Sequence, residues 1–155
     1  MKLTAEDILK EKGNEIVSVT PDTTIADAIK KMNSNKIGAV LVVDVNGYIG
    51  IWTERDLLKN LLIESFDVKT SLVKDYMTTN LVYAKYDDSL YQLLDKFLGR
   101  RIRHLLVEKE GEYIGFLSTG DVMRSGLVLK SKELEEMNAI LSWEYYENWN
   151  FEPKK

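Results

Sequence analysis

The sequence predicts an α+β fold made of two β-α-β-β-α repeats, related by a pseudo-two-fold axis and followed by a C-terminal aromatic-rich helix. Three observations lead to this prediction. Residues 16–58 align with residues 81–123 without a gap, and ten of the 43 aligned pairs are identical. Each copy changes between strand spacing and helix spacing in the same order. The last segment, residues 129–155, has no counterpart in the repeat.

The elements of the first copy follow from its hydrophobic spacing. The stretch 16–19 predicts a short strand, and apolar residues at positions 25, 28, 29 and 32 recur at helical spacing. The apolar run 39–43 and the segment 48–52 predict two strands joined by a hairpin turn at Asn46-Gly47. Thr53 then opens a helix that carries Leu57, Leu58, Leu61 and Leu62.

The second copy repeats these elements in the same order. After a strand at 81–84 come a helix, a hairpin turn at Glu110-Gly111 and a helix from Ser118; the first of these helices carries Leu90, Leu93, Leu94, Phe97 and Leu98. Upstream, Asp7-Ile8-Leu9 resembles Asp75-Tyr76-Met77 at an offset of 68, so the three extra residues around Lys12-Gly13-Asn14 are expected to form a loop. Each unit is too small to bury both helix faces alone, so we expect the two to pack together.

Composition and charge exclude several classes of function. The 21 basic and 25 acidic side chains give a net charge of -4, so there is no broad cationic field for nucleic acid or an anionic membrane. The absence of cysteine removes thiolate catalysis and cysteine-ligated metals, and a single histidine, His104, leaves little for a metal cluster. With no signal peptide and no run of 18 apolar residues, we expect a cytoplasmic protein without a membrane partner.

A doubled motif carries the functional prediction. Both copies contain Gly-X-apolar-apolar followed by Ser/Thr-X-X-Asp-apolar-apolar, at residues 50–58 and 115–123. With these two copies in equal register, the chain resembles a tandem pair of cystathionine-β-synthase (CBS) domains, the arrangement called a Bateman module. The resemblance covers about residues 5–128. It places one CBS domain at 5–66, a second at 72–128 and a helical tail at 129–155.

The resemblance implies a stand-alone regulatory protein rather than an enzyme. Such pairs typically bind an adenosine ligand, namely AMP, ADP, ATP or S-adenosylmethionine, in clefts between the repeats, and signal to a regulated partner. In the family the Ser/Thr hydroxyl and the following Asp hold the ribose, which here means Thr53 with Asp56 and Ser118 with Asp121. The chemistry agrees, because a helix N-terminus presents unpaired N–H groups and a carboxylate accepts hydrogen bonds from a ribose diol.

The same spacing also has a purely structural interpretation. Ser/Thr-X-X-Asp is the capping-box pattern, and it recurs at Thr4/Asp7 and Thr24/Asp27, with Ser89/Gln92 as a relative. A ligand-independent dimeric scaffold whose tail recruits a partner is therefore the alternative function. An enzyme is a third hypothesis, and the least supported, because the sequence has no Walker-type glycine loop and no nucleophile motif.

Cations near the motifs are expected to contact phosphates. Arg55 lies inside the first motif, and family resemblance implies phosphate contacts for residues placed like Arg103 and His104. Strand alternation would put Arg101 and Arg103 on one face and His104 on the other. Arg100 and Arg101 are expected in a solvated loop. Small side chains at Gly38 and Ala39 are candidates for admitting a nucleobase closely.

The tail and the oligomeric state complete the prediction. Ser131 is expected to cap a separate helix in which apolar residues recur on one side, followed by five aromatics within nine residues: Trp143, Tyr145, Tyr146, Trp149 and Phe151. So much apolar area is expected to pack on the repeats or on a second subunit. Family resemblance implies a homodimer, and an apolar excess after the first motif favours it independently: Leu57, Leu58, Leu61, Leu62 and Ile63.

Overall fold

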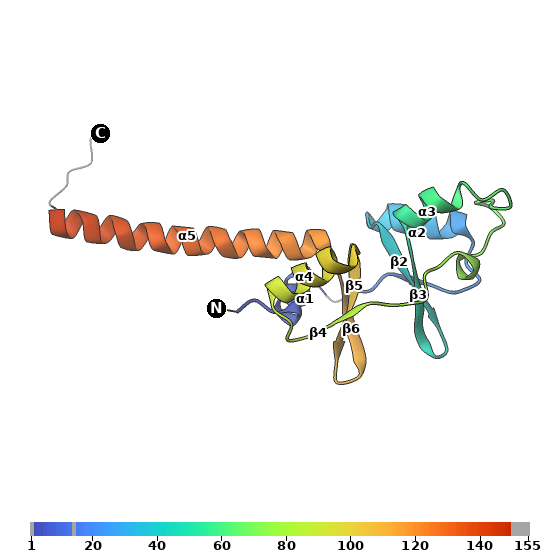
Figure 1. Cartoon of the computed structure of the whole chain (residues 1–155), viewed down its shortest axis with the longest axis horizontal. Coiled ribbons are helices and arrows are strands. Elements are labelled where there is room, and N and C mark those ends of the chain that lie inside the picture. The colour runs from blue at the N-terminus through green and yellow to red at the C-terminus, as the bar shows by residue number, and fades with distance from the viewer. Residues whose placement is uncertain (1, 14, 150–155) are drawn as a thin grey trace.

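The computed structural model describes residues 2–13 and 15–149, with residues 141–149 described by their backbone alone. Helices and strands alternate in the predicted order (Figure 1). The elements are α1 (Ala5–Lys12), β1 (Ser18–Val19), α2 (Ile25–Asn35), β2 (Ala39–Asp44), β3 (Gly47–Thr53), α3 (Glu54–Asn60), the 3-10 turn η1 (Val73–Asp75), β4 (Tyr83–Lys85), α4 (Leu90–Arg100), β5 (His104–Lys109), β6 (Glu112–Ser118) and α5 (Thr119–Trp149).

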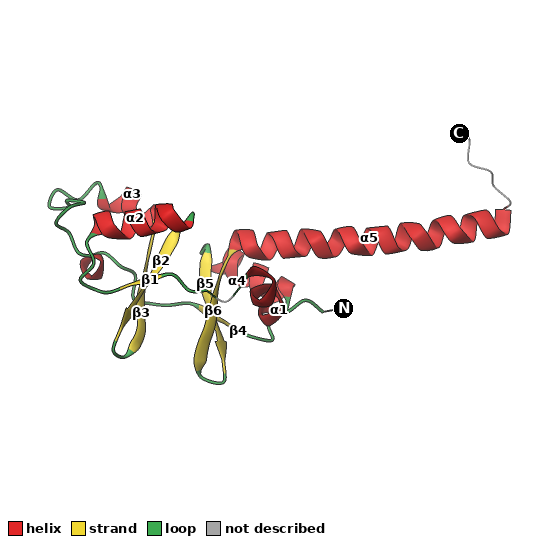
Figure 2. Cartoon of the chain, turned by 180° about the vertical axis from the view of Figure 1, so that it is seen from behind, coloured by secondary structure: helices red, strands yellow, loops and turns green. Residues whose placement is uncertain are grey.

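Two three-stranded sheets lie side by side, one in each repeat (Figure 2). In the first sheet β1 is parallel to β2, and β2 is antiparallel to β3. The second sheet repeats this arrangement with β4, β5 and β6. Ser18 pairs with Leu41, and Tyr83 pairs with Leu106, both 65 residues later. The structure thus confirms the α+β repeat predicted from the sequence.

The segment in front of each repeat packs on the other repeat. In α1, Ile8 and Leu9 are fully buried in the core of the second repeat, whereas Val73 of η1 is buried in the core of the first. Backbone hydrogen bonds mirror this exchange, because Leu90 N donates to Leu3 O at 3.0 Å and Ile25 N donates to Ser71 O at 2.9 Å. The exchange ties the two repeats into one body.

Two glycines make this exchange possible. A Cβ on Gly50 would overlap the side chain of Met77, and a Cβ on Gly115 would overlap Leu9 at 2.5 Å. Leu9 and Met77 are the residues that correspond at the offset of 68. Both positions of the motif therefore need glycine because the exchanged segment lies directly against the strand.

Two element boundaries differ from the sequence prediction, and the second hairpin agrees with it. The first hairpin turns at Val45-Asn46, and Gly47, with φ at 108°, already belongs to β3. The second hairpin turns at Glu110-Gly111 as predicted, with positive φ at both residues as a two-residue turn favours. The helix α3 ends at Asn60, so the predicted helical residues Leu61 and Leu62 follow it.

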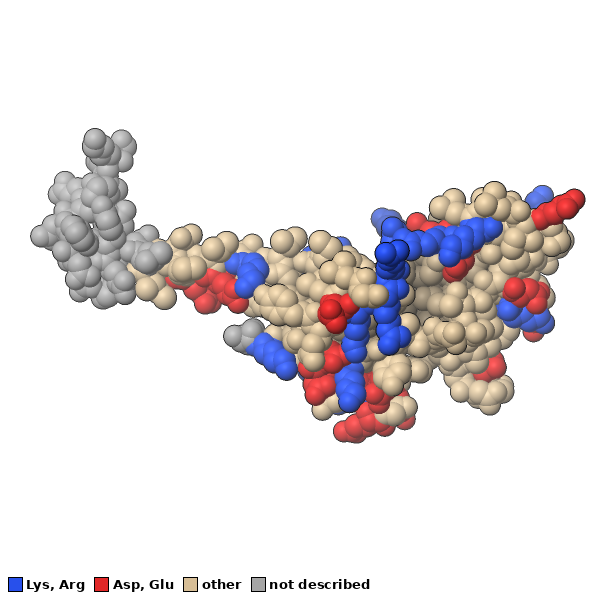
Figure 3. Space-filling view, viewed as in Figure 1, with Lys and Arg blue, Asp and Glu red and all other residues tan. Residues whose placement is uncertain are grey.

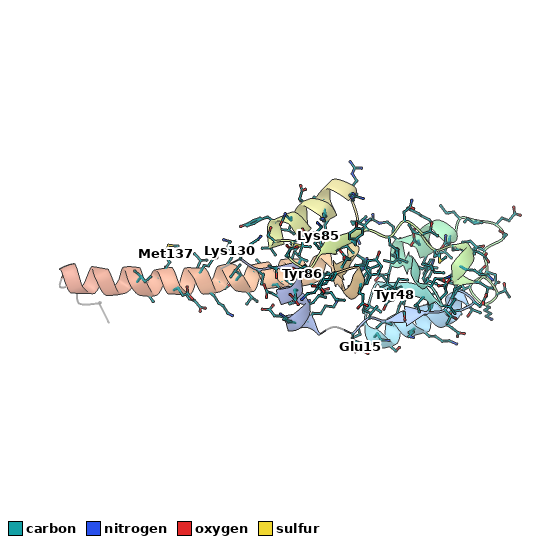
Figure 4. The ribbon with its side chains drawn as sticks, turned by 90° about the horizontal axis from the view of Figure 1, so that it is seen from below. Glu15, Tyr48, Lys85, Tyr86, Lys130 and Met137 are labelled. Carbon is teal, nitrogen blue, oxygen red and sulfur yellow. The ribbon has the colours of Figure 1, made fainter. Side chains whose placement is uncertain are left out.

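The C-terminal helix is not a separate element. The helix α5 runs without a break from Thr119 to Trp149, so Ser131 lies inside it and is not an N-cap. Figure 1 shows the helix leaving the repeats beyond α1 and α4. The side chains of residues 130–140 are all exposed, and Figure 4 shows Met137 on this bare part. Of the two predicted packing sites for the tail, the repeats of the same chain do not bury residues 130–140; packing on a second subunit stays a prediction.

The aromatic part of the tail lies outside what the structure describes in full. The backbone of Trp143, Tyr145, Tyr146 and Trp149 belongs to α5, but their side chains lie outside the described ones, as does Phe151 altogether.

Among the residues that the structure describes, no helix has the length and apolar character that a membrane span requires.

Candidate ligand cleft

A cleft of about 470 Å³ lies between the two repeats. Six of the nine predicted site residues line it: Gly38, Thr53, Arg55, Asp56, Arg103 and His104. The other three do not. Ala39 is buried in the first sheet, and Ser118 and Asp121 are not among the lining residues, although their neighbours Thr119 and Gly120 are.

Thr53 and Asp56 stand at one end of the cleft as a capping box. Thr53 Oγ1 accepts a hydrogen bond from Asp56 N at 3.2 Å, and Asp56 Oδ2 accepts from Thr53 N and Thr53 Oγ1, both at 3.0 Å. The same geometry occurs at Thr4/Asp7. The two interpretations of the motif are therefore compatible at Thr53/Asp56, because this cap also lines the cleft, and the second carboxylate oxygen of Asp56 accepts no hydrogen bond from the described residues.

Gly38 faces the same end of the cleft for a steric reason. A Cβ at this position would overlap the carboxylate of Glu54, the first residue of α3, and Glu54 N donates to Gly38 O at 3.0 Å. The glycine lets the start of α3 lie close to the start of β2. This close approach fixes the position of Thr53 and Asp56 at the cleft.

Four cationic side chains line the cleft: Arg55, Lys59, Arg101 and Arg103. Figure 3 shows Lys and Arg side chains gathered in a band between the two repeats. None of the four forms an ion pair with an acidic side chain among the described residues. Glu54 and Asp56 are the acidic residues of the lining, so cationic groups are in excess there.

One prediction about the basic cluster was wrong. Arg101 lies in an exposed turn, as the sequence predicted, and also lines the cleft; Arg100 is the last residue of α4 and does not line it. Arg101, Arg103 and His104 all line the same cleft, although alternation would divide them. The reason is that alternation requires a strand, and β5 begins only at His104. Arg101 is instead the left-handed C-cap of α4, with φ at 52°.

His104 forms part of the cleft wall as a neutral ring. Its imidazole stacks on Phe116 with ring centroids 5.4 Å apart and an interplanar angle of 3°. Burial lowers the pKa of His104 from 6.5 to about 4; Lys12 and Arg103 act in the same direction and Asp121 opposes them. The ring therefore offers an uncharged flat surface and a hydrogen-bonding nitrogen at neutral pH.

The second copy of the motif is covered by a lysine. Asp121 Oδ2 accepts from Ser118 N at 2.8 Å and from Ser118 Oγ at 2.9 Å, which repeats the pattern at Thr53/Asp56. It also accepts from Lys12 Nζ at 2.8 Å. Burial alone would raise the pKa of Asp121, but the hydrogen bonds from Lys12 and Ser118 outweigh it and hold the pKa below its ordinary value.

Sequence reasoning missed several residues of the cleft: Lys59, Thr78, Asn80, Leu81, Val82 and Arg101. Lys59 follows Arg55 by one helical turn, and this spacing is a signal that the sequence does contain. Thr78 enters the cleft because its N and O pair with Ile51 of β3, which no local pattern predicts. Among the described residues, no group of three or more His, Asp or Glu side chains is arranged to hold a metal ion.

Comparisons with known proteins agree with the doubled motif. The family model for the CBS domain matches residues 5–63 and 73–127. The CBS domain-containing protein CBSX3, mitochondrial, of Arabidopsis thaliana is 31% identical over 151 residues, which cover 92% of this chain and 73% of that protein. The inosine-5'-monophosphate dehydrogenase of Methanocaldococcus jannaschii is 31% identical over 112 residues, which cover 71% of this chain and only 21% of the enzyme.

Solved structures share the fold. The crystal structure of the CBS-domain containing protein ATU1752 from Agrobacterium tumefaciens has a TM-score of 0.75 and 37% identity, covering 80% of this chain and 93% of that one. The crystal structure of CBSX2 in complex with AMP has a TM-score of 0.67 and 25% identity, covering 83% of this chain and 98% of that one.

Proposed function

Because the chain belongs to the CBS-domain family, we propose that it is a regulatory module that binds an adenine nucleotide in the cleft and signals to a partner protein. The AMP complex of CBSX2 supports an adenosine ligand. The observation that carries the proposal is the Thr53/Asp56 pair, whose carboxylate faces the cleft beside unpaired cations.

Each group of residues has a role in this proposal. Asp56 accepts hydrogen bonds from the ribose hydroxyls, with Thr53 beside it, and each charge-assisted bond contributes about 1.5–3 kcal/mol. Arg55 and Arg103 contact phosphate oxygens. His104 and Gly38 border the space for the base. Ala39, Ser118 and Asp121 take no part at this end of the cleft, because they do not line it.

The charge of the cleft favours phosphorylated ligands over S-adenosylmethionine. The four lining cations form no ion pair with the acidic side chains that the structure describes, so they attract anions, and the attraction grows with the number of phosphates. S-adenosylmethionine carries a positive sulfonium, which these side chains repel. We therefore expect affinity to decrease in the order ATP, ADP, AMP and S-adenosylmethionine.

A binding panel tests the proposal. Purified protein is titrated calorimetrically with the four ligands, and its melting is followed in parallel. A ligand at 100 times its dissociation constant stabilises the folded state by about 2.7 kcal/mol, which for a chain of this size raises the melting temperature by about 5–10 °C. No heat and no shift with any of the four ligands would exclude the proposal and favour the scaffold.

A matched pair of variants separates ligand binding from capping. Asp56→Asn should weaken nucleotide binding about ten-fold or more, since a loss of about 1.4 kcal/mol is ten-fold. Asp7→Asn alters a capping box of the same geometry outside the cleft and should leave affinity unchanged. Equal affinities for both variants and the wild type would identify Asp56 as a cap alone.

A homodimer is part of the proposal. Leu57 packs against the first core, but four apolar neighbours stay exposed on the single chain: Leu58, Leu61, Leu62 and Ile63. Such a contiguous apolar surface is typical of an interface. The exposed apolar residues of α5, including Leu134 and Met137, favour the scaffold as the second candidate function, with α5 as its docking element.

A further inference from the structure

The two motif carboxylates differ in their cationic contacts. Asp56 and Asp121 correspond in the repeat, and each accepts hydrogen bonds from the N and Oγ of the residue three positions earlier. Among the described residues, only Asp121 also has cationic partners: Lys12 Nζ lies 2.8 Å from Oδ2, and the exposed Arg124 Nη1 lies 4.0 Å from Oδ1. The Asp121 side chain is 13% exposed. Lys12 thus adds a charge-assisted hydrogen bond to the oxygen that Ser118 already caps, and no such bond is made to Asp56.

Lys12 is held by more than one partner. Its Nζ also donates to Phe116 O at 2.8 Å and lies 5.9 Å from the centroid of the Phe116 ring. One residue earlier, Glu11 Oε2 accepts from Ser125 Oγ at 3.0 Å, one turn along α5 from Asp121. The end of α1 is therefore fixed to the first turns of α5 by two side chains, and the position of Lys12 is set by the fold.

The first motif has no equivalent of this cation. At the offset of 68 that relates Leu9 to Met77, Lys12 corresponds to Asn80. Asn80 lines the cleft and makes no side-chain contact with Asp56 in the described structure. Asn60, which corresponds to Ser125, accepts from Trp52 Nε1 inside its own repeat at 3.0 Å.

We propose that Lys12 is a specificity-determining residue that excludes nucleotide from the Ser118/Asp121 motif, so that each chain binds one nucleotide, at Thr53/Asp56. This proposal rests on the proposed function. A ribose diol that uses both carboxylate oxygens of Asp121 must displace the charge-assisted contact of Lys12 with Oδ2, and neutral hydroxyl groups replace an ammonium poorly. At Asp56 the same diol meets a carboxylate that, among the described residues, accepts hydrogen bonds from Thr53 alone and forms no ion pair.

Calorimetric titration of the full chain with ATP tests the proposal through stoichiometry. The wild type should take up one ATP per chain. Lys12→Met keeps the aliphatic stem but removes the ammonium, and should take up two. Lys12→Arg keeps a cation and should take up one. Lys10→Met, at an exposed position of the same helix, is the matched control and should also take up one.

Two further variants keep the test decisive. Lys12→Met/Asp121→Asn lacks the freed carboxylate and should return to one ATP per chain. Asp121→Asn alone should bind ATP once with unchanged affinity. Two ATP per wild-type chain, or one per chain in a folded Lys12→Met variant, would overturn the proposal while the proposed function stands. No uptake by the wild type would overturn both.

Discussion

The two repeats share a backbone and differ in the helix that follows the motif. In the first repeat α3 is seven residues long and ends at Asn60, which accepts a hydrogen bond from Trp52 of the same repeat. In the second repeat α5 continues for 31 residues, and Ser125 bonds to Glu11 of α1. The strand register and both motif caps are the same. Because the strands and caps agree, the exposure of Asp56 to the cleft and the pairing of Asp121 with Lys12 follow from the side chains that α1 places on the second repeat.

The largest expected effect tests the packing of α1 in the core of the second repeat. Leu9→Ala removes a fully buried side chain from the second core and should lower the free energy of unfolding by about 2–5 kcal/mol. Met77→Ala, the corresponding change in the first repeat, should cost less because Met77 is only half-buried. Urea denaturation measures both, and Lys10→Ala is the exposed control. A Leu9→Ala loss below that of Met77→Ala would contradict the described packing.

The next effect is a pH dependence confined to the second repeat. His104 has an ordinary pKa of 6.5 when unfolded and about 4 when folded, so folding favours the neutral ring. Its contribution is fully present above about pH 6.5 and is lost as the pH falls toward 4. The loss is up to about 3 kcal/mol. The corresponding residue of the first repeat is Ala39, which does not titrate.

A His104→Phe variant isolates this contribution. Denaturation of the wild type and the variant at pH 7, 5.5 and 4 should give a stability difference that changes with pH in the predicted window. Asp7, Glu6 and Asp121 have lowered pKa values and lose their contributions at lower pH in both proteins. Parallel pH profiles for the two proteins would show that the His104 ring does not titrate as its burial requires.

A smaller effect distinguishes Asn60 from Ser125, the corresponding polar residues of the helices that follow the two motifs. Asn60→Ala leaves the buried Trp52 Nε1–H without an acceptor and should cost about 1–3 kcal/mol. Ser125→Ala removes the hydroxyl group that donates to Glu11. Because Glu11 is exposed and water can replace the donor, the change should cost about 0.5–1.5 kcal/mol. Thermal denaturation compares them. Equal losses would mean that the tie between α1 and α5 contributes as much as the internal bond of the first repeat.

The sequence predicted those features of the fold that depend on local periodicity. The strand and helix order, the equal register and the caps at Thr53/Asp56 and Ser118/Asp121 all follow from residues close together in the chain. The exchange of α1 and η1 between repeats does not, because it depends on tertiary contacts. The same holds for Lys12 and Asp121, which are 109 residues apart. No spacing rule connects a lysine in a predicted loop with the second motif.

The prediction about the tail failed for a related reason. A serine before an apolar helical stretch is typical of an N-cap, but Ser131 is equally compatible with a helix already running from Thr119. The place of Arg101 in the cleft was missed for a similar reason, because it depends on the left-handed C-cap that ends α4. In both places the preceding element, and not the residue's own neighbours, decides the conformation.

The smallest expected effect concerns the two parts of α5. Leu129 packs against the second core, whereas the side chains of residues 130–140 are all exposed. A chain that ends after Leu129 should therefore unfold at nearly the same urea concentration, with a free energy within about 0.5 kcal/mol of the full chain. Leu129→Ala in the full chain is the contrast and should lower stability more. Light scattering on the truncated chain then measures the mass of its assembly. A fall in this mass at unchanged stability would place Leu134, Met137 and Ile140 between subunits. A large loss of stability in the truncated chain would instead mean that the bare part of α5 supports the second repeat, and the two parts would no longer be distinct.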